Sequence, residues 1–464
     1  MNIEKLFGMA SRGAPSGRTP VRETFADFLY QPFFKAGIGI VLTVGCLWGA
    51  LNLLDIALQR NFLQLRLVAA IHAHAHAMVF GWVGLFVMGF AYQSFPRFRY
   101  ATLWRPDLAV ATLALMLAGI AARVGAELLQ PAPLGLALGG VAAVLELAAI
   151  GLFLWILRKS LKSAVGPAQP YETFLRAGLF WFAVQAVLSD FFFFAKVTAH
   201  TTQELVQRIA LLDGPLRDIQ LLGFAGFMIA GVSLRMLPMA YGFRRGGRDR
   251  LRLIFWLMNV SLLLDVAAYF ALLTTRRLAF AGVLEVAYLL MLAWGILLAR
   301  QIGVFTPAAE PDRSLKFFRA GYAWLLVALA MIPFAPLYGR LTGQVFSHAY
   351  WGAYRHAFTV GFISMMILGM SSRLVPMMSG LDRAGLSSLG GPFLLLNFGN
   401  AARVILQILT DFVPGTAYPL LGLSGFVEVT ALAWWGFELW RTMRLARTHR
   451  AQLFGLPSAS PGMD

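Results

Sequence analysis

Histidines with a regular spacing are the residues of this chain best suited to chemistry. His72, His74 and His76 alternate with alanines inside one apolar stretch, and His356 lies in another, far along the chain. A neutral imidazole is a common ligand for metal ions and a standard axial ligand for haem iron. On a helix, His72 and His76 share one face, and His74 points nearly the opposite way. The four histidines are therefore candidate metal ligands, and the first three could serve two sites from one helix.

His76 and His356 occupy the same place in an internal repeat. Each lies 20 residues before a proline, and a third copy of the pattern, ending at Pro238, has Asp218 at that position. Glycines recur 15 and 7 residues before the three prolines Pro96, Pro238 and Pro376, as Gly81, Gly223 and Gly361 and as Gly89, Gly231 and Gly369. The glycines alone favour close helix packing. The matched histidines favour a shared role, in which the two imidazoles ligate one haem iron from opposite sides.

Apolar runs near the ~20 residues needed to span a bilayer position these histidines. The mean hydropathy is +0.69, and only 13% of residues are charged. Twelve spans are predicted, roughly 32–58, 70–97, 106–129, 134–158, 173–197, 215–240, 250–273, 278–300, 316–337, 350–377, 390–411 and 418–441. The sequence predicts an all-α polytopic membrane protein with one membrane domain over residues 32–441 and mobile ends at 1–31 and 442–464.

The spans group into three repeats of about 32–158, 173–300 and 316–441. Each repeat holds four spans, so each enters and leaves the membrane on the same side. The repeats are therefore parallel and related by rotation about the membrane normal. This predicts a pseudo-threefold ring of helices, with the histidines in its outer half.

The net charge of +17 marks topology rather than an acidic partner. Arginines crowd alternate loops, for example Arg244 to Arg252, and follow the last span, whereas the loops near Gln130 and Pro414 have none. Basic loops face the cytoplasm. We therefore expect both termini inside a bacterial-type inner membrane, with the lipid bilayer and no nucleic acid as a partner. Cys46 is the only cysteine, so a haem attached through two cysteines is excluded and a bound haem would be non-covalent haem b.

Two arginines recur 27 residues after the first and third prolines. Arg123 and Arg403 could pair with Glu146 and Glu428 of their own repeats, since a lone arginine in hydrocarbon is costly. Alternatively, they could clamp haem propionates through bidentate contacts. The second repeat has Asp265 at this position, so its acids could form a proton path or a hard-metal site. They could also simply pair with Arg217 and Arg235.

Two stretches resemble the NnrS family of haem- and copper-containing membrane proteins linked to nitric oxide. They are the segment from His74 to Gly81 and the segment from His356 to Gly361, and Arg373 stands where that family has an arginine. The twelve-span plan resembles subunit I of haem–copper oxidases, in which the second and tenth helices carry the low-spin haem ligands. The resemblance implies haem at His76 and His356, with His74 serving a second haem or metal, and copper as a further cofactor.

The usual oxygen-reducing site cannot be built, because the sixth span has Asp218 and Gln220 and the seventh has no histidine. The leading hypothesis is therefore a membrane haem b protein that handles nitric oxide or carries electrons in a respiratory membrane, with a quinol or cytochrome as redox partner. If it is an enzyme, it is an oxidoreductase but not a standard oxygen reductase. The alternative is a haem-free secondary transporter or channel built from parallel repeats.

Overall fold

The helices of the computed structural model agree with the predicted spans. The structure describes residues 27–59, 65–130, 133–244, 246–247, 249–382 and 385–453, and within these ranges the regular structure is entirely helical. Twelve helices of this described part are long and apolar enough to cross a membrane. The prediction of an all-α membrane protein with twelve spans is confirmed. The predicted mobile ends lie outside the described residues over 1–26 and 454–464.

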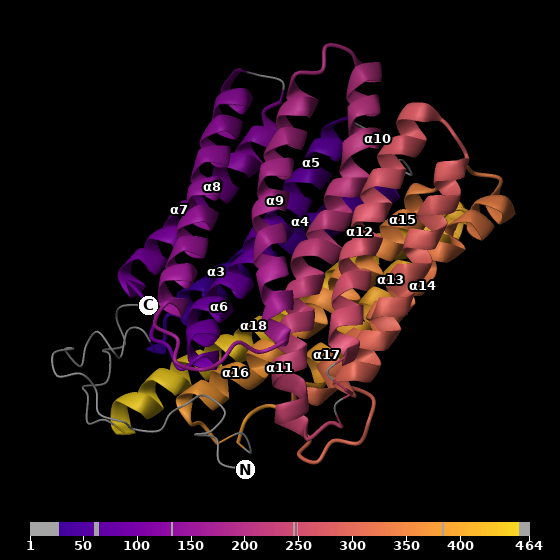
Figure 1. Cartoon of the computed structure of the whole chain (residues 1–464). Coiled ribbons are helices and arrows are strands. Elements are labelled where there is room, and N and C mark those ends of the chain that lie inside the picture. Colours follow the sequence, from indigo (N-terminus) through magenta and orange to yellow (C-terminus); the bar gives the residue numbers. More distant parts are fainter. Residues whose placement is uncertain are drawn as a thin grey trace. The chain divides into compact units, whose positions relative to one another are not determined.

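The elements follow one another along the chain (Figure 1), and some α-helices and π-helical segments are consecutive parts of one span. In order they are α3 (Tyr30–Ile40), η1 (Val41–Gly45), α4 (Cys46–Gln59), α5 (Leu65–His76), η2 (Ala77–Gly84), α6 (Leu85–Phe98), α7 (Pro106–Leu128), α8 (Pro133–Leu161), α9 (Tyr171–Val197), α10 (Thr202–Asp218), η3 (Ile219–Gly226), α11 (Phe227–Tyr241), α12 (Asp249–Thr275), α13 (Ala279–Ile302), α14 (Leu315–Thr342), α15 (His348–His356), η4 (Ala357–Ser364), α16 (Met365–Ser379), α17 (Gly390–Leu409) and α18 (Pro414–Leu453).

The last helix is longer than its predicted span. α18 continues to Leu453, although the sequence predicts that the span ends at 441 and a mobile tail follows. Arginine, leucine and alanine dominate this extension, and all three have high helix propensity. Met443 and Ala446 are also fully buried, so packing holds the extension.

Three π-helical segments mark the repeat within the helices. Each of η2, η3 and η4 has eight residues and begins 19 residues before its repeat's proline. The residue just before each segment is His76, Asp218 or His356, the position that the sequence repeat singles out. π-helical turns are rare and frequently lie at functional sites. The repeat is therefore visible in local backbone geometry, whereas the pseudo-threefold arrangement in space stays a prediction.

The repeated glycines let the second helix of each repeat approach the first. A Cβ atom at any of the glycines 7 residues before the prolines would lie within about 3 Å of a side chain on that first helix. These contacts join Gly89 to Phe33, Gly231 to Leu175, and Gly369 to Phe318. The packing interpretation of these glycines is supported at all three positions.

Replacing Gly231 with alanine should destabilise the protein, because the new Cβ would lie 2.6 Å from Leu175 Cδ2 and 3.0 Å from the Leu175 backbone nitrogen. Overpacking of this kind costs about 1–3 kcal/mol. Gly140→Ala is the matched control, since nothing lies within 4 Å of a Cβ there and helix propensity rises. Apparent unfolding temperatures in detergent measure both variants, and equal temperatures would contradict the packing role of Gly231.

Contacts divide the chain into two compact units. Unit 1 holds residues 1–45, 64–234 and 248–290, and unit 2 holds residues 46–63, 235–247 and 291–464. In unit 1, α8 packs along both α7 and α9 (Figure 1). In unit 2, α18 packs along both α17 and α4. His72, His74 and His76 belong to unit 1, and His356 belongs to unit 2.

Candidate functional site

The three histidines of α5 diverge onto two faces, as the spacing predicts. His72 and His76 are buried against side chains of α7, α8 and α9, with 7% and 5% of their surface exposed. His74 is partly exposed and turns the other way, where its Nδ1 donates to the backbone carbonyl of Gly45 over 2.8 Å. The two-face prediction for this helix is confirmed.

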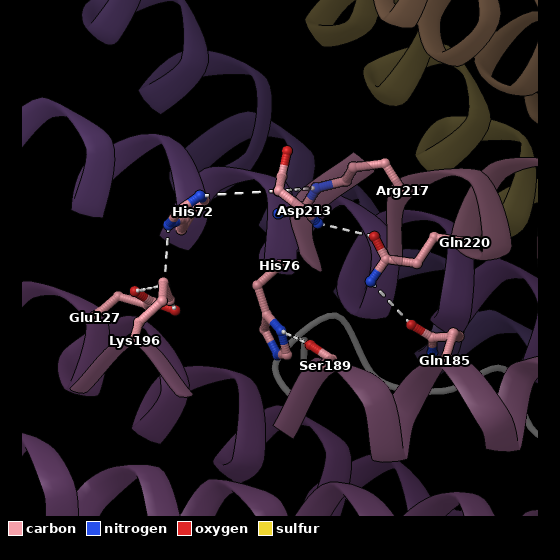
Figure 2. Close-up of polar contacts among 9 residues, drawn as sticks. All are labelled: His72, His76, Glu127, Gln185, Ser189, Lys196, Asp213, Arg217 and Gln220. Carbon is pink, nitrogen blue, oxygen red and sulfur yellow. Dashed lines mark hydrogen bonds and ion pairs between the residues drawn. The ribbon is translucent and has the colours of Figure 1, made fainter. Parts of the chain in front are cut away.

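His72 belongs to a buried ion cluster in unit 1 (Figure 2). Lys196 donates from Nζ to both carboxylate oxygens of Glu127, over 2.8 and 2.7 Å, and to His72 Nδ1 over 2.9 Å. An ammonium group can only donate, so Nδ1 accepts and the imidazole proton sits on Nε2. Lys196 and Glu127 are each 4% exposed. The cluster is therefore a desolvated ion pair with an imidazole attached.

Phenylalanines of α9 pack against this cluster. Lys196 Nζ lies 5.0 Å from the ring centroid of Phe192, and the Arg123 guanidinium lies 4.5 Å from that of Phe193. The faces of these aromatic rings attract the cations, which partly offsets the cost of burying the cations in an apolar region. The run of four phenylalanines in the sequence thus lines a charged region as well as filling apolar space.

The His72 side of the cluster continues toward α10 and α9. His72 Nε2 lies 3.9 Å from Asp213 Oδ1, which accepts a hydrogen bond from Arg217 Nε over 3.1 Å. Arg217 also donates to Gln220 Oε1 over 2.8 Å, and Gln220 donates to Gln185 over 3.1 Å (Figure 2). Polar side chains from α5, α7, α9, α10 and η3 therefore form one connected network.

His76 is held by a carboxylate of α8. Its Nε2 donates to Glu146 Oε1 over 2.7 Å, its Nδ1 lies 3.5 Å from Ser189 Oγ, and its ring stacks on Phe80 at 4.2 Å. Gly119 makes room for this acid, because a Cβ there would lie 2.5 Å from Glu146 Cγ. The basic nitrogen of His76 is therefore Nδ1, and protein encloses it.

Arg123 does not pair with Glu146, which was the structural alternative for this arginine. Its guanidinium forms an ion pair with Asp190 of α9 instead. Glu146 accepts a hydrogen bond from His76, whereas Asp190 accepts one from Arg123 Nη2. Arg123 Nε and Nη1 are buried without a hydrogen-bond partner in the described part of the chain. This guanidinium therefore retains unsatisfied donors.

His356, like His74, is oriented by a hydrogen bond to a backbone carbonyl. Its Nδ1 donates to the carbonyl of Gly352 over 2.9 Å, and its side chain is partly exposed. A carbonyl can only accept, so in neutral His74 and His356 the proton is on Nδ1 and the lone pair is on Nε2. Metal-bound histidines almost always donate their other ring N–H to a carbonyl or carboxylate in this way. Both residues thus present the tautomer that suits a metal ligand.

A row of buried polar groups accompanies His356 in unit 2. Asn400, Arg403 and Gln407 share one face of α17, and their exposure is 0%, 6% and 3%. A Cβ at Gly352 would meet Gln407, so α15 packs directly on this face. Arg403 interacts electrostatically with Glu428 of α18, as the sequence predicts for this pair. All four side chains have buried atoms without a hydrogen-bond partner among the described residues.

In the second repeat, two acidic residues occupy the positions that hold a histidine and an arginine in the other two repeats. Asp265 of α12, 2% exposed, is hydrogen-bonded to the side chain of Asp218. Arg217 is directed to Asp213 and Gln220 instead of Asp265. The suggestion that Arg217 pairs with these acids is therefore wrong for Asp265, which is hydrogen-bonded to another carboxyl group.

Arg373, the third family-like position, fastens a loop of unit 2. Its guanidinium pairs with Asp312 in the loop before α14, donates to the Ala240 carbonyl over 3.1 Å, and lies 4.6 Å from the Tyr241 ring centroid. Asp312 also accepts from Tyr241 Oη over 2.9 Å and from the Ser314 backbone N–H over 2.9 Å. Arg373 is therefore a structural residue in this unit.

Low pH should weaken the ion pair between Arg373 and Asp312. Burial alone would raise the pKa of Asp312, but Arg373 and the donors of Ser314 outweigh it and hold that pKa below its usual 3.8. Because the folded-state pKa is lowered, the stabilisation is complete above the unfolded value and is lost as pH falls through the folded value. Unfolding temperatures from neutral pH to below 3.8 should therefore fall less steeply in Asp312→Asn than in the wild type. Identical slopes would contradict this role of Asp312.

No three side chains of the types His, Cys, Asp and Glu are placed to hold one metal ion, over the residues that the structure describes. The predicted ligands His72 and His76 are engaged by Lys196 and Glu146, so each would have to exchange a partner to reach a metal through that nitrogen. His74 and His356 make their carbonyl bonds through Nδ1, and the tautomer that these bonds select carries its lone pair on Nε2. The donor chemistry therefore fits iron ligation at the latter two.

Sequence patterns do not reveal most of the network. No repeat or spacing singles out Lys196, Glu127, Asp190 and Asp213, although three of them lie within predicted spans. A charge within a span is costly, and that cost was the available indication. Their partners come from separate helices, so spacing along the chain could not pair them.

Comparison with known families covers nearly all of these elements. A model of the NnrS protein family matches residues 25–447, which include every helix from α3 to α17 and most of α18. A search of curated proteins finds no match. The matched region contains both histidine segments, so the resemblance seen in two short stretches extends through the membrane domain. The chain belongs to the NnrS family.

Proposed function

We propose that this membrane protein binds b-type haem and handles nitric oxide or carries electrons in a respiratory membrane. The observation that supports it best is the shared setting of His74 and His356. Each is partly exposed, and each donates Nδ1–H to a backbone carbonyl, which leaves the lone pair on Nε2. The resemblance to haem-containing proteins linked to nitric oxide supplies the substrate class.

Haem, when bound, supplies an iron that exchanges one electron or coordinates a small diatomic ligand. The protein's part is to hold the imidazoles in one orientation. The carbonyls of Gly45 and Gly352 do this for His74 and His356, because each fixes the ring and its tautomer.

Two buried arginines favour the binding of an anionic cofactor. Arg123 and Arg403 are buried and have guanidinium donors without a partner in the described part of the chain. A buried unsatisfied donor costs about 1–3 kcal/mol or more, so it favours binding of an acceptor. Propionate carboxylates of haem are acceptors of the right charge. His76 as a haem ligand stays a prediction of the sequence repeat.

The direct test is a visible spectrum of the purified protein. Protein expressed with a haem supply and purified in detergent should show a Soret band and a reduced α-band, with iron bound in proportion to protein. Nitric oxide added to the reduced form should shift the Soret band if the protein handles that gas. Absence of haem bands and of iron in such a preparation would contradict the proposal.

A second candidate is a haem-free transporter, and the buried network of unit 1 favours it. Ionisable groups inside a membrane commonly mark ion or proton pathways, and Lys196, Glu127, His72 and Asp213 form a connected series. Proteoliposomes containing iron-free protein should then carry protons or substrate, and Glu127→Gln should stop that flux. Tight impermeability of such liposomes would remove this candidate.

A further inference from the structure

A pocket at the end of α8 carries basic and aromatic residues only. It has a volume of about 230 Å³ and is lined by Trp155, Arg158, Lys159 and Lys162. The three basic residues lie three, four and seven positions after Trp155, so all four side chains project from one side of α8 and the turn after it. The pocket lies wholly in unit 1, at the last turns of a membrane-spanning helix.

A second tryptophan comes from the loop before α7. Trp104 packs edge-on against Trp155, with ring centroids 4.8 Å apart, and its backbone N–H donates to Ser160 Oγ over 2.9 Å. The Lys159 ammonium lies 5.9 Å from one ring and 5.7 Å from the other. Tryptophan is enriched where a span meets the lipid headgroups. The pocket thus combines headgroup-level aromatic residues with fixed positive charge.

No carboxylate of the described residues neutralises the positive charge of the pocket. Within the described residues, Arg158, Lys159 and Lys162 form no ion pair with a carboxylate. Neighbouring arginines are paired, since Arg99 contacts Glu172 and Arg105 contacts Asp107. Three cations therefore remain for an external anion. A helix C-terminus attracts cations, but that attraction does not explain a hollow between them.

We propose that this pocket binds the phosphate headgroup of an anionic phospholipid. Basic pockets among transmembrane helices on the cytoplasmic side bind anionic lipid headgroups, such as that of cardiolipin. The position at the end of a span offers a phosphodiester at the right depth, with acyl chains running along the exposed side of α8, where Val144, Leu147 and Gly151 face outward. The assignment is independent of haem binding.

Lipid retention measures this site. Delipidated protein in detergent is titrated with phosphatidylglycerol and, separately, with phosphatidylcholine, and bound lipid is counted by native mass spectrometry. The wild type should retain phosphatidylglycerol and not phosphatidylcholine. The double variant Lys159→Gln, Lys162→Gln should bind phosphatidylglycerol about thirtyfold more weakly, the loss expected for two basic residues at a lipid surface.

Two controls make the outcome specific. Arg250→Gln with Arg252→Gln removes the same charge from exposed positions at the start of α12, and its affinity should stay within about threefold of the wild type. Lys159→Arg with Lys162→Arg keeps the charge and should retain the lipid. An equal loss in the α12 variant, or no loss in the pocket variant, overturns the proposal. Displacement of the lipid by millimolar inorganic phosphate would assign the pocket to free phosphate instead and would also overturn it.

Discussion

Replacing Lys196 with methionine should destabilise the protein by about 3–5 kcal/mol, one of the largest effects expected from any single substitution here. The ammonium makes two hydrogen bonds to Glu127 and one to His72, and all three residues are buried. Without it, Glu127 stays as an uncompensated charge in a region that excludes water, and His72 Nδ1 loses its donor.

The size of this effect distinguishes a buried pair from a surface pair. Arg208 and Glu204 form an ion pair four residues apart on α10, but their side chains are about a third exposed. Exposed pairs contribute up to about 1 kcal/mol. Arg208→Met should therefore cost much less than Lys196→Met, as judged by apparent unfolding temperature or by resistance to denaturing detergent.

The double variant Lys196→Met, Glu127→Leu separates the pair's net contribution from the cost of breaking it. Apolar replacement of a whole buried pair is often neutral or stabilising, so this protein should recover most of the lost stability. Failure to recover would mean that the pair itself, or its bond to His72, stabilises the fold. Similar losses in Lys196→Met and Arg208→Met would contradict the burial of the cluster.

The sequence predicts the fold well because each membrane span appears in it as a long run of apolar residues. Apolar length sets each span, and the structure places a helix over every one of the twelve. The end of α18 differs from its predicted span, since the helix continues past residue 441 through the basic residues to Leu453. The repeat was also readable, because the glycines that admit a neighbouring helix must recur wherever the same approach recurs.

The site was less predictable because sequence equivalence does not fix environment. His76 and His356 match in the repeat and both precede a π-helical segment, yet Glu146 holds one and a backbone carbonyl orients the other. His74, outside the repeat match, shares the carbonyl orientation of His356. The difference arises from residues on other helices, whose distances no spacing rule along one chain can supply.

This difference predicts distinct outcomes for the histidines. If the proposed function holds, His356→Gly and His74→Gly should each remove most of the haem band that ligation at that residue supports, because a bound haem iron would lose an imidazole nitrogen. His76→Ala should instead lower stability by about 1–3 kcal/mol or more, since Glu146 would be left buried without its donor, and the band should persist. Spectra normalised to folded protein measure the first effect, and unfolding temperatures measure the second.

Added imidazole provides the control for ligation. Free imidazole can enter the space left by His356→Gly and donate to the same Gly352 carbonyl that orients the native ring. The band should return with imidazole and not with an equal concentration of a non-coordinating salt. If imidazole restores the band in His76→Gly but not in His356→Gly or His74→Gly, the repeat-matched histidine of unit 1 is the ligand, and the tautomers of His74 and His356 do not identify the haem ligands. Loss of the band in every variant without rescue would mean that these imidazoles support the haem environment through packing alone.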